Sequence, residues 1–252
     1  MIKIQNLHKA FGTKRVLQGV DLAIVRGKTT TIFGISGGGK STIIKHIVGL
    51  LVPDRGQIIV DGIRLSHRDP ATLYAIRRKV GFLFQSGALF DSMSVEENVA
   101  FPLLEHTTHG PTERSKRIHR ALELVGLKPS EVLPLYPHEL SGGMRKRVGL
   151  ARTIIFEPEV ILYDEPTSGL DPVTSDRISR MILHLQAQLG VTSVLISHDI
   201  NESFKCSDYI AMLHEGRIVD YGEAEHFKDS SHPVVRQFVT GSVEGPIQLL
   251  ND

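Results

Sequence analysis

Apolar and polar residues alternate in several short runs near the start of the chain. Ile2 and Ile4 form the first run, "VDLAI" at 20–24 forms the second, and "GQIIVDG" at 56–62 forms a third that ends in a turn. A period of two is typical of strands that bury one face and expose the other. We therefore expect an antiparallel β region in this part of the chain.

Continuous apolar runs occur at three other places. They are "TTIFGI" at 30–35, "VILYDE" at 160–165 and "TSVLISHD" at 192–199. Short runs of this kind are typical of parallel strands that are buried on both faces. We expect these three runs to be the core strands.

A helix is predicted between the last two of these runs. Asp171 can cap its start, Pro172 suits its first turn, and Gly190 can end it. Apolar residues recur at helical spacing between these ends, at Ile178, Met181, Ile182, Leu185 and Leu189. The succession of strand, helix and strand predicts an α/β core.

The remaining segments are less regular. Residues 91–140 contain helical patches such as "RIHRALELVGL" but no strong strand, so we expect a helical insertion there. The run "HEGRIVDYG" at 214–222 has the pattern of a hairpin. The stretch at 232–252 follows it as an appendage.

The composition narrows the class of protein. The chain has 252 residues, of which 41% are hydrophobic, and a formal net charge of +1, which suits one large globular domain. This balance gives no general attraction to nucleic acid. The single cysteine, Cys206, excludes an internal disulfide, and the twelve histidines form no HExxH motif. With no internal disulfide and no uninterrupted apolar core of signal-peptide type at 1–15, we expect a cytosolic protein. The apolar stretch at 43–52 is too short to span a bilayer, so a membrane role would need a partner.

A glycine-rich segment follows the first buried run. Gly34-x-x-x-x-Gly39-Lys40-Ser41 fits the P-loop pattern between a predicted strand and a predicted helix. In this pattern, backbone N–H groups surround a phosphate, the lysine reaches the terminal phosphates and the serine hydroxyl is offered to Mg²⁺. The alternative is a turn that binds nothing, but strand, spacing, lysine and serine together favour phosphate binding.

Two adjacent acids end the second buried run. Asp164 and Glu165 would lie at the carboxyl end of a strand, where α/β folds bind ligands. Beside a P-loop, Asp164 can serve Mg²⁺ and Glu165 can orient or deprotonate the attacking water.

A second glycine pair, in "LSGGMRKRVGLAR" at 140–152, precedes a basic helical segment and predicts another anion site. One nucleotide does not need two distant phosphate sites, so we expect a dimer in which each chain completes the other's site.

With these motifs, the sequence resembles the ATP-binding cassette (ABC) ATPases of membrane transporters over nearly its whole length. Six motifs stand in the family's order: Walker A "GISGGGKST", the Q-loop in "FLFQSG", the signature "LSGGM", Walker B "VILYDE", the D-loop "SGLD" and the switch histidine in "ISHD". The resemblance implies ATP hydrolysis with Mg²⁺. It also implies an α/β P-loop NTPase (RecA-like) core with an antiparallel β subdomain and a helical signature-motif subdomain at about 91–155.

The resemblance also assigns roles to single residues. The nucleotide-binding residues would be Phe11, which stacks on adenine, and Gly34, Ser36, Gly37, Gly38, Gly39, Lys40, Ser41 and Thr42. The catalytic residues would be Lys40, Gln85, Glu165 and His198, and the Mg²⁺ residues would be Ser41, Gln85 and Asp164. The signature residues acting on the partner's nucleotide would be Ser141, Gly142 and Gly143, with Asp171 communicating across the interface. Met144 replaces the glutamine that many members have after "LSGG", so a contact of that glutamine does not carry over.

A narrower resemblance lies in "FLFQSGALFDSMSVEENVAFPLLEHT" at 82–107, in the signature segment and in "VVRQFVTGSVEGPI" at 234–247. These are similar to the ATPase subunits of lipid transporters associated with MCE-domain proteins, such as the maintenance-of-lipid-asymmetry (Mla) system of Gram-negative envelopes. This implies an ATPase homodimer at the cytoplasmic face of the inner membrane, with integral membrane permease subunits, an MCE-domain protein and a small accessory cytosolic subunit as partners. No nucleic acid is expected, and neither the cargo nor its direction follows from ATPase chemistry.

Two surfaces are expected to meet partners. The segment "SGALFDSMSVEENVAF" after Gln85 is expected to dock the permease, although its apolar residues could instead pack the chain's own helical subdomain. We expect a domain at 1–230 and an interaction tail at 231–252, with folding back onto the same subunit as the alternative. The apolar residues that carry the tail expectation are Val234, Val235, Phe238, Val239, Ile247, Leu249 and Leu250.

Three other functions remain open at this point. The chain could serve an importer of amino acids or other small solutes. It could be a soluble cassette ATPase acting on DNA or ribosomes, but such proteins more often carry tandem cassettes, a long coiled coil or a basic arm. A regulator that binds nucleotide without hydrolysing it is disfavoured because Glu165 and His198 are both present.

Overall fold

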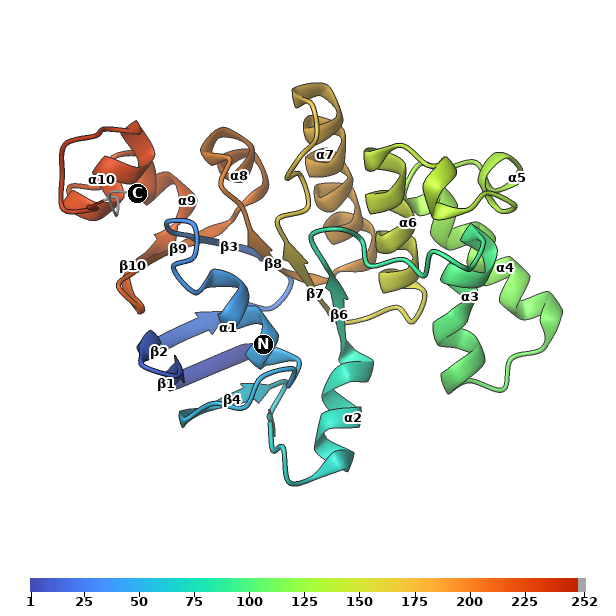
Figure 1. The fold of residues 1–252 in the computed structure, drawn as a ribbon, viewed down its shortest axis with the longest axis horizontal. Helices are drawn as coiled ribbons and strands as arrows, with labels where there is room; N and C mark the ends of the chain where they lie inside the picture. Colours follow the sequence, from blue (N-terminus) through green and yellow to red (C-terminus); the bar gives the residue numbers. More distant parts are fainter. Residues whose placement is uncertain (249–252) are drawn as a thin grey trace. The chain divides into compact units, whose positions relative to one another are not determined.

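The computed structural model describes residues 1–248 and divides into two compact units (Figure 1). The first unit comprises Met1–Ile76 and Val194–Asp252, and the second comprises Arg77–Ser193. Among residues 1–248, no helix has both the length and the apolar content needed to cross a bilayer.

A four-stranded antiparallel sheet in the first unit confirms the alternating pattern at the start of the chain. Its strands are β1 (Ile2–Phe11), β2 (Lys14–Ile24), β4 (Arg55–Val60) and β5 (Ile63–Arg64), in the order β2-β1-β4-β5. Ile4 lies opposite Leu22 of β2 and Ile58 of β4, and all three side chains are buried. One face of the sheet therefore belongs to the core.

A second sheet in this unit contains the buried strands. The strands of that sheet that lie in this unit are β3 (Thr29–Phe33), β8 (Thr192–Ile196), β9 (Tyr209–His214) and β10 (Arg217–Glu223), in the order β10-β9-β3-β8. β3 and β9 run parallel with Phe33 beside Met212, and β10 returns antiparallel to β9, which confirms the hairpin. The helices α1 (Lys40–Ile47) and α8 (Ile200–Cys206) come after β3 and β8 in the chain.

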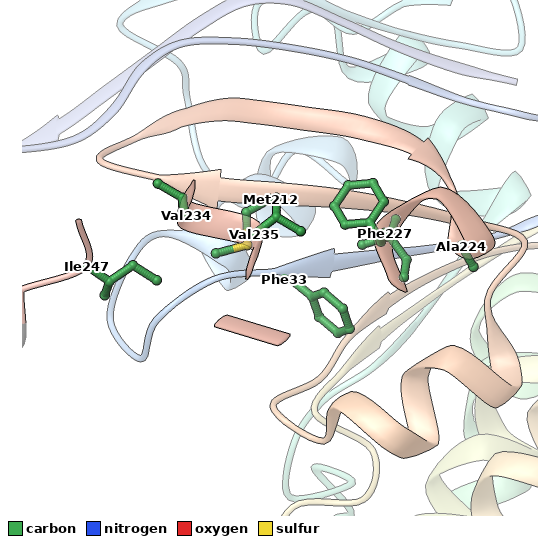
Figure 2. Close-up of a cluster of buried hydrophobic side chains, with 8 residues drawn as sticks. Phe33, Met212, Ala224, Phe227, Val234, Val235 and Ile247 are labelled. Carbon is green, nitrogen blue, oxygen red and sulfur yellow. The ribbon is translucent and has the colours of Figure 1, made fainter. Parts of the chain in front are cut away.

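The C-terminal stretch packs onto the first unit. α9 (Ala224–Lys228) and α10 (Pro233–Thr240) follow β10. Val234, Val235 and Ile247 are buried in one hydrophobic cluster with Phe33 of β3 (Figure 2). Gln237 fastens the chain beyond α10, because its Nε2 donates to the Ile247 carbonyl (3.1 Å) and its Oε1 accepts from the Ile247 N–H (2.6 Å). We call this group of buried residues around Phe33 the C-terminal cluster.

This packing bears on the expected boundary at residue 230. The apolar side chains of α10 are covered by their own chain, as in the fold-back alternative, and Phe238 is partly buried against the same cluster. An interaction role for 231–252 stays a prediction, and it would have to use other faces of this stretch. Leu249 and Leu250, which were counted with the tail, lie outside the described residues.

The second unit joins two parallel strands to a set of helices. β6 (Val80–Leu83) pairs with β7 (Val160–Asp164), with Leu83 opposite Tyr163. The predicted helical insertion is present as α3 (Val95–His106), α4 (Pro111–Leu124), α5 (Pro129–Val132), a 3₁₀ turn (Pro137–Glu139) and α6 (Gly142–Ile154). α7 (Pro172–Leu189) begins after Asp171, which accepts the Thr174 N–H, and ends at Gly190. Both ends of this helix agree with the sequence.

Several elements have no counterpart in the expectations, among them β5, α2 (Pro70–Lys79), β6, α8 and α9. α2 leads from the first unit into the second, and β6 follows it directly. Ile76 is the one residue of α2 that is buried, so this helix does not need the wide apolar stripe by which a helix is recognised in a sequence. β6 is four residues long and contains Gly81, which obscures the strand pattern.

Candidate active site

The P-loop forms the turn between β3 and α1 in the first unit. Lys40 is the first residue of α1, and its ammonium donates to the carbonyls of Gly34 and Ile35 at 2.9 Å each. Ser36 and Gly37 are exposed at the tip of this turn. α1 begins directly at this turn, and the partial positive charge of a helix N-terminus is suited to a phosphate.

Glycine is required at two positions of this loop. At Gly34 the backbone φ is 151°, and a Cβ would come within 2.5 Å of the Leu213 carbonyl oxygen. At Gly39 φ is 107°, and a Cβ would lie 2.9 Å from the Val16 side chain. The loop can therefore close tightly only with glycine at these positions. Ser41 and Thr42 follow in the first turn of α1, both half-buried.

Phe11 lies at the end of β1, where an adenine would need an open aromatic face. Its side chain is 48% exposed, so it is not a core residue. The Lys9 ammonium lies 5.4 Å from the ring centroid. A base stacked on Phe11 would therefore have a cation close to it.

His198 lies in the first unit just beyond β8. It is exposed and directly precedes Asp199, the N-cap of α8, whose side chain accepts from the Glu202 N–H at 2.9 Å. The P-loop, Phe11 and His198 are thus the expected site residues that belong to the first unit.

The acidic pair lies in the second unit, where β7 ends. Asp164 is buried (6% exposed), and Glu165 follows in a left-handed conformation with φ of 50°. This conformation is unfavourable for a residue with a side chain and is often retained where function requires it. Gln85 Nε2 donates to Glu165 Oε2 at 3.0 Å and to Ser168 Oγ at 3.2 Å. The Q-loop glutamine is therefore in direct contact with the expected general base.

A buried lysine supports this segment from the signature helix. Lys146 on α6 is only 7% exposed, and its ammonium donates to the carbonyls of Ser168 (2.5 Å) and Glu165 (3.4 Å). Burial lowers the pKa of Lys146, and the negative charge of Glu165 opposes that effect. Nothing in the sequence marks this lysine, because "RKR" reads as a solvated basic run.

The signature motif starts α6. Ser141 is its exposed N-cap, and the hydroxyl accepts from the Met144 N–H at 3.3 Å. Gly142 is half-buried and Gly143 is buried. A Cβ at Gly143 would come within 2.6 Å of Thr174 Cγ2. The second signature glycine is thus needed for close packing against α7.

Thr174 also holds the D-loop aspartate. Its hydroxyl and its N–H donate to the two carboxylate oxygens of Asp171, at 2.6 and 3.0 Å. The pKa of Asp171 is lowered, mainly by the hydrogen bond from the Thr174 hydroxyl and next by the one from the Thr174 N–H. Gln85, the acidic pair, the signature residues and Asp171 all belong to the second unit. In the described part of the chain, no three His, Cys, Asp or Glu side chains gather as a metal site.

The geometry and the motifs define a class of protein that comparison with known sequences confirms. The profile of the ABC transporter family matches residues 17–168. The chain belongs to this family and is an ABC-type ATPase that powers a membrane transporter.

Three relatives are similar to this chain over nearly its whole length. The probable ribonucleotide transport ATP-binding protein mkl of Mycobacterium tuberculosis is 43% identical over 98% of this chain and 68% of its own length. The intermembrane phospholipid transport system ATP-binding protein MlaF of Escherichia coli K12 is 38% identical over 98% of this chain and 91% of its own. The chloroplastic protein TRIGALACTOSYLDIACYLGLYCEROL 3 of Arabidopsis thaliana is 39% identical over 98% and 76%. The expected likeness to Mla-type ATPases is confirmed.

Solved structures agree with the fold. The dimeric bacterial ABC transporter cassette MJ0796 is 33% identical, with a TM-score of 0.82, over 89% of this chain and 99% of that one. cbiO1 of Clostridium perfringens, part of a cbiONQ transporter complex, is 31% identical, with a TM-score of 0.82, over 90% of each chain. The expected α/β cassette fold is therefore confirmed.

Proposed function

We propose that this ATPase drives a phospholipid transporter and that it binds its membrane partner beside the Q-loop. The observation that carries the lipid assignment is the likeness to MlaF, which extends over nearly the full length of both chains. Ribonucleotide transport, named for mkl, is the second candidate because that relative is equally complete over this chain. Small-solute import remains as the more general alternative.

The chemistry proposed for the site uses the chain's own residues. Lys40 and the P-loop backbone would hold the phosphates, and Glu165 would take a proton from the attacking water. The contact between Gln85 Nε2 and Glu165 Oε2 supports a pairing of these two residues in the resting enzyme. A carboxylate has two acceptor oxygens, so Glu165 could accept a proton from water while Gln85 stays bound to Oε2.

Mg²⁺ would be held by Ser41, Gln85 and Asp164. A hydroxyl, an amide carbonyl and a carboxylate are the hard oxygen ligands that Mg²⁺ prefers. Asp164 is fixed at the end of a buried strand, which suits a residue that must not move with its ligand. When bound, the ion would neutralise charge on the phosphates.

An aromatic groove in the second unit supports docking of a membrane partner. It has a volume of about 380 Å³, and five phenylalanines contribute to its lining: Phe82, Phe84, Phe90, Phe101 and Phe156. Phe90 is 41% exposed and packs on Phe101, with ring centroids 4.9 Å apart. Arg152 fixes the segment after Gln85, because its guanidinium donates to the carbonyls of Gly87 (3.0 Å) and Ala88 (2.8 Å). An apolar helix end would fit such a groove.

Not every residue of the expected docking segment faces outward. Val95 is fully buried and packs its own unit, which agrees with the alternative for that residue. Leu89 and Met93 are half-buried. The docking role is therefore proposed for Phe90 and the groove that it lines, and for Met93, whose N–H donates to the Phe90 carbonyl at 3.1 Å.

The proposed partners are a second copy of this chain, integral membrane permease subunits, an MCE-domain protein and a small accessory cytosolic subunit. This assembly would place the ATPase peripherally at the cytoplasmic face of the inner membrane. The experiment is co-purification of the native complex followed by lipid analysis. Co-purified phospholipid and an MCE-domain partner are expected, whereas a solute-binding partner without lipid would favour small-solute import.

A further inference from the structure

A cationic cavity lies on the antiparallel sheet of the first unit, and none of its lining residues belongs to the P-loop at 34–42. Its volume is about 380 Å³, within the range of small-molecule sites. It is lined by the end of β1, the start of β2, the start of β4 and the first residue of β10. Its cationic lining residues are Lys9, Arg15, Arg55 and Arg217, and Asp54 is the one carboxylate among the described residues that line it.

The register of the strands brings these residues together. His8 of β1 lies opposite Gln18 of β2 and opposite Arg55 of β4, and Ala10 lies opposite Arg15. Gln18 also binds the turn between β9 and β10, since its N–H donates to the Gly216 carbonyl at 2.8 Å. The convergence of the arginines is therefore built into the sheet.

The carboxylate in the cavity is already used. Asp54 Oδ1 pairs with the Lys9 ammonium at 3.1 Å, and Asp54 Oδ2 accepts the Ala10 N–H at 2.7 Å. The pKa of Asp54 is lowered, mainly by the hydrogen bond from the Ala10 N–H and next by the hydrogen bond from Lys9. Asp54 and Lys9 thus neutralise one another and leave three arginine charges.

Those three guanidinium groups have no acceptor in the described part of the chain. Arg15, Arg55 and Arg217 are exposed, and none of them makes an ion pair or a side-chain hydrogen bond with residues 1–248. Three like charges around one cavity repel one another unless an anion neutralises them. Guanidinium forks match phosphate oxygens in pairs, so a phosphate group is the best complement.

We propose that this cavity binds a phosphate-bearing dianion at a site separate from the P-loop. The class of ligand is a phosphomonoester group, either free in solution or on a lipid headgroup. Arg55 of β4 and Arg217 of β10 would balance its two negative charges, and Arg15 of β2 would supply a third guanidinium donor. The site does not depend on the proposed transport function.

The test uses the full chain saturated with ADP and Mg²⁺, so that the P-loop is filled. Two probes are titrated at fixed ionic strength: inorganic phosphate, and vesicles of phosphatidylcholine containing phosphatidic acid. Binding is followed by the NMR signals of the arginine Nε–H groups. Arg55→Gln and Arg217→Gln are compared with Arg64→Gln, a matched change of an exposed arginine on β5 of the same sheet that does not line the cavity.

We expect saturable binding of at least one probe, with shifts at Arg55 and Arg217. Because each cavity variant removes a charged hydrogen-bond donor, it should weaken binding roughly tenfold or more, and Arg64→Gln should not. Saturation by inorganic phosphate identifies a free phosphate ligand, and saturation by phosphatidic acid vesicles alone identifies a headgroup.

Three results would overturn the proposal. The first is that neither probe binds saturably. The second is that Arg64→Gln weakens binding as much as the cavity variants do. The third is that vesicles containing phosphatidylglycerol, at the same total charge, bind as well as those containing phosphatidic acid. The cavity variants should hydrolyse ATP like the unchanged protein, so a failure of this proposal is separable from a failure of the ATPase mechanism.

Discussion

The ammonium of Lys146 donates to the carbonyl oxygen of Ser168 at 2.5 Å, and this contact ties the signature helix to the turn that carries Glu165. The turn itself closes through the Ser168 N–H, which donates to the Glu165 carbonyl at 3.2 Å. Lys146 therefore reaches both ends of a turn whose first residue is held at a positive φ. In a dimer, a signature helix that meets the partner's nucleotide would be linked by this lysine to the acid of its own site.

Replacing Lys146 by methionine should lower turnover without weakening ATP binding. The change removes the ammonium donor from two carbonyls, of which only that of Glu165 keeps another donor within residues 1–248, the Ser168 N–H. Loss of a charged hydrogen bond costs about 1.5–3 kcal/mol. If about 1.4 kcal/mol of this cost falls on the transition state, kcat falls roughly tenfold. Lys146→Arg should restore part of the rate because it keeps the charge and the donors, and Lys116→Met, at an exposed lysine of α4, serves as the control. An unchanged kcat in a folded Lys146→Met protein would contradict this role.

Lys40 and Glu165 should fail for different reasons. Lys40→Ala removes the ammonium that lies inside the P-loop, so phosphate binding and turnover should both be lost. Glu165→Gln keeps the shape of the side chain but not its basicity, so ATP should stay bound while hydrolysis slows by about a hundredfold or more. Nucleotide binding and single-turnover rates distinguish the two. A Glu165→Gln enzyme with a near-normal rate would exclude Glu165 as the base.

A shared site predicts complementation between two inactive proteins. Lys40→Ala damages the P-loop, whereas Ser141→Arg blocks the exposed start of the signature helix. A mixed dimer contains one site with an intact P-loop and an intact signature, so mixing the variants should recover activity. Specific activity should also rise with protein concentration. If heterodimers form, as measured by mass, and no activity returns, the two motifs do not share a site.

Truncation after Asp229 should destabilise the first unit rather than release a separate tail. It removes Val234, Val235 and Ile247 from the C-terminal cluster and exposes Phe33, which directly precedes the P-loop. A melting temperature lower by many degrees and weaker ATP binding are expected, since several buried apolar side chains are lost together. A chain ending at Gln248 keeps the whole cluster and is the control. If the truncated protein has the melting temperature and ATP affinity of the full chain, the stretch after Asp229 is not part of the core of the first unit.

Much of the fold was accessible from the sequence because its signals are local. The alternation around Ile4, the caps at Asp171 and Gly190, and the glycine-rich turn at 34–42 each depend on residues that are close in the chain. The structure places each of them where the pattern indicates. The β6 strand escaped because four residues around Gly81 carry too little periodicity to be recognised.

The support of the site was not accessible, because it depends on contacts between distant residues. Lys146 reaches Ser168 across 22 positions, and Gln85 reaches Glu165 across 80. Thr174 has the pattern of an ordinary residue in the first turn of a helix, yet its methyl group explains why position 143 must be glycine. Motifs identify the residues that meet the ligand, whereas the residues that hold them are identified only by packing.

The ring of Phe238 in α10 lies 5.4 Å from the ring of Phe33, on the strand that leads into the P-loop. The chain contains no tryptophan. An indole introduced by Phe238→Trp would therefore be the sole strong fluorophore of the molecule, set against the base of the phosphate loop. Its emission would report on that strand in real time, so nucleotide entry and departure could be followed optically without labelling the nucleotide.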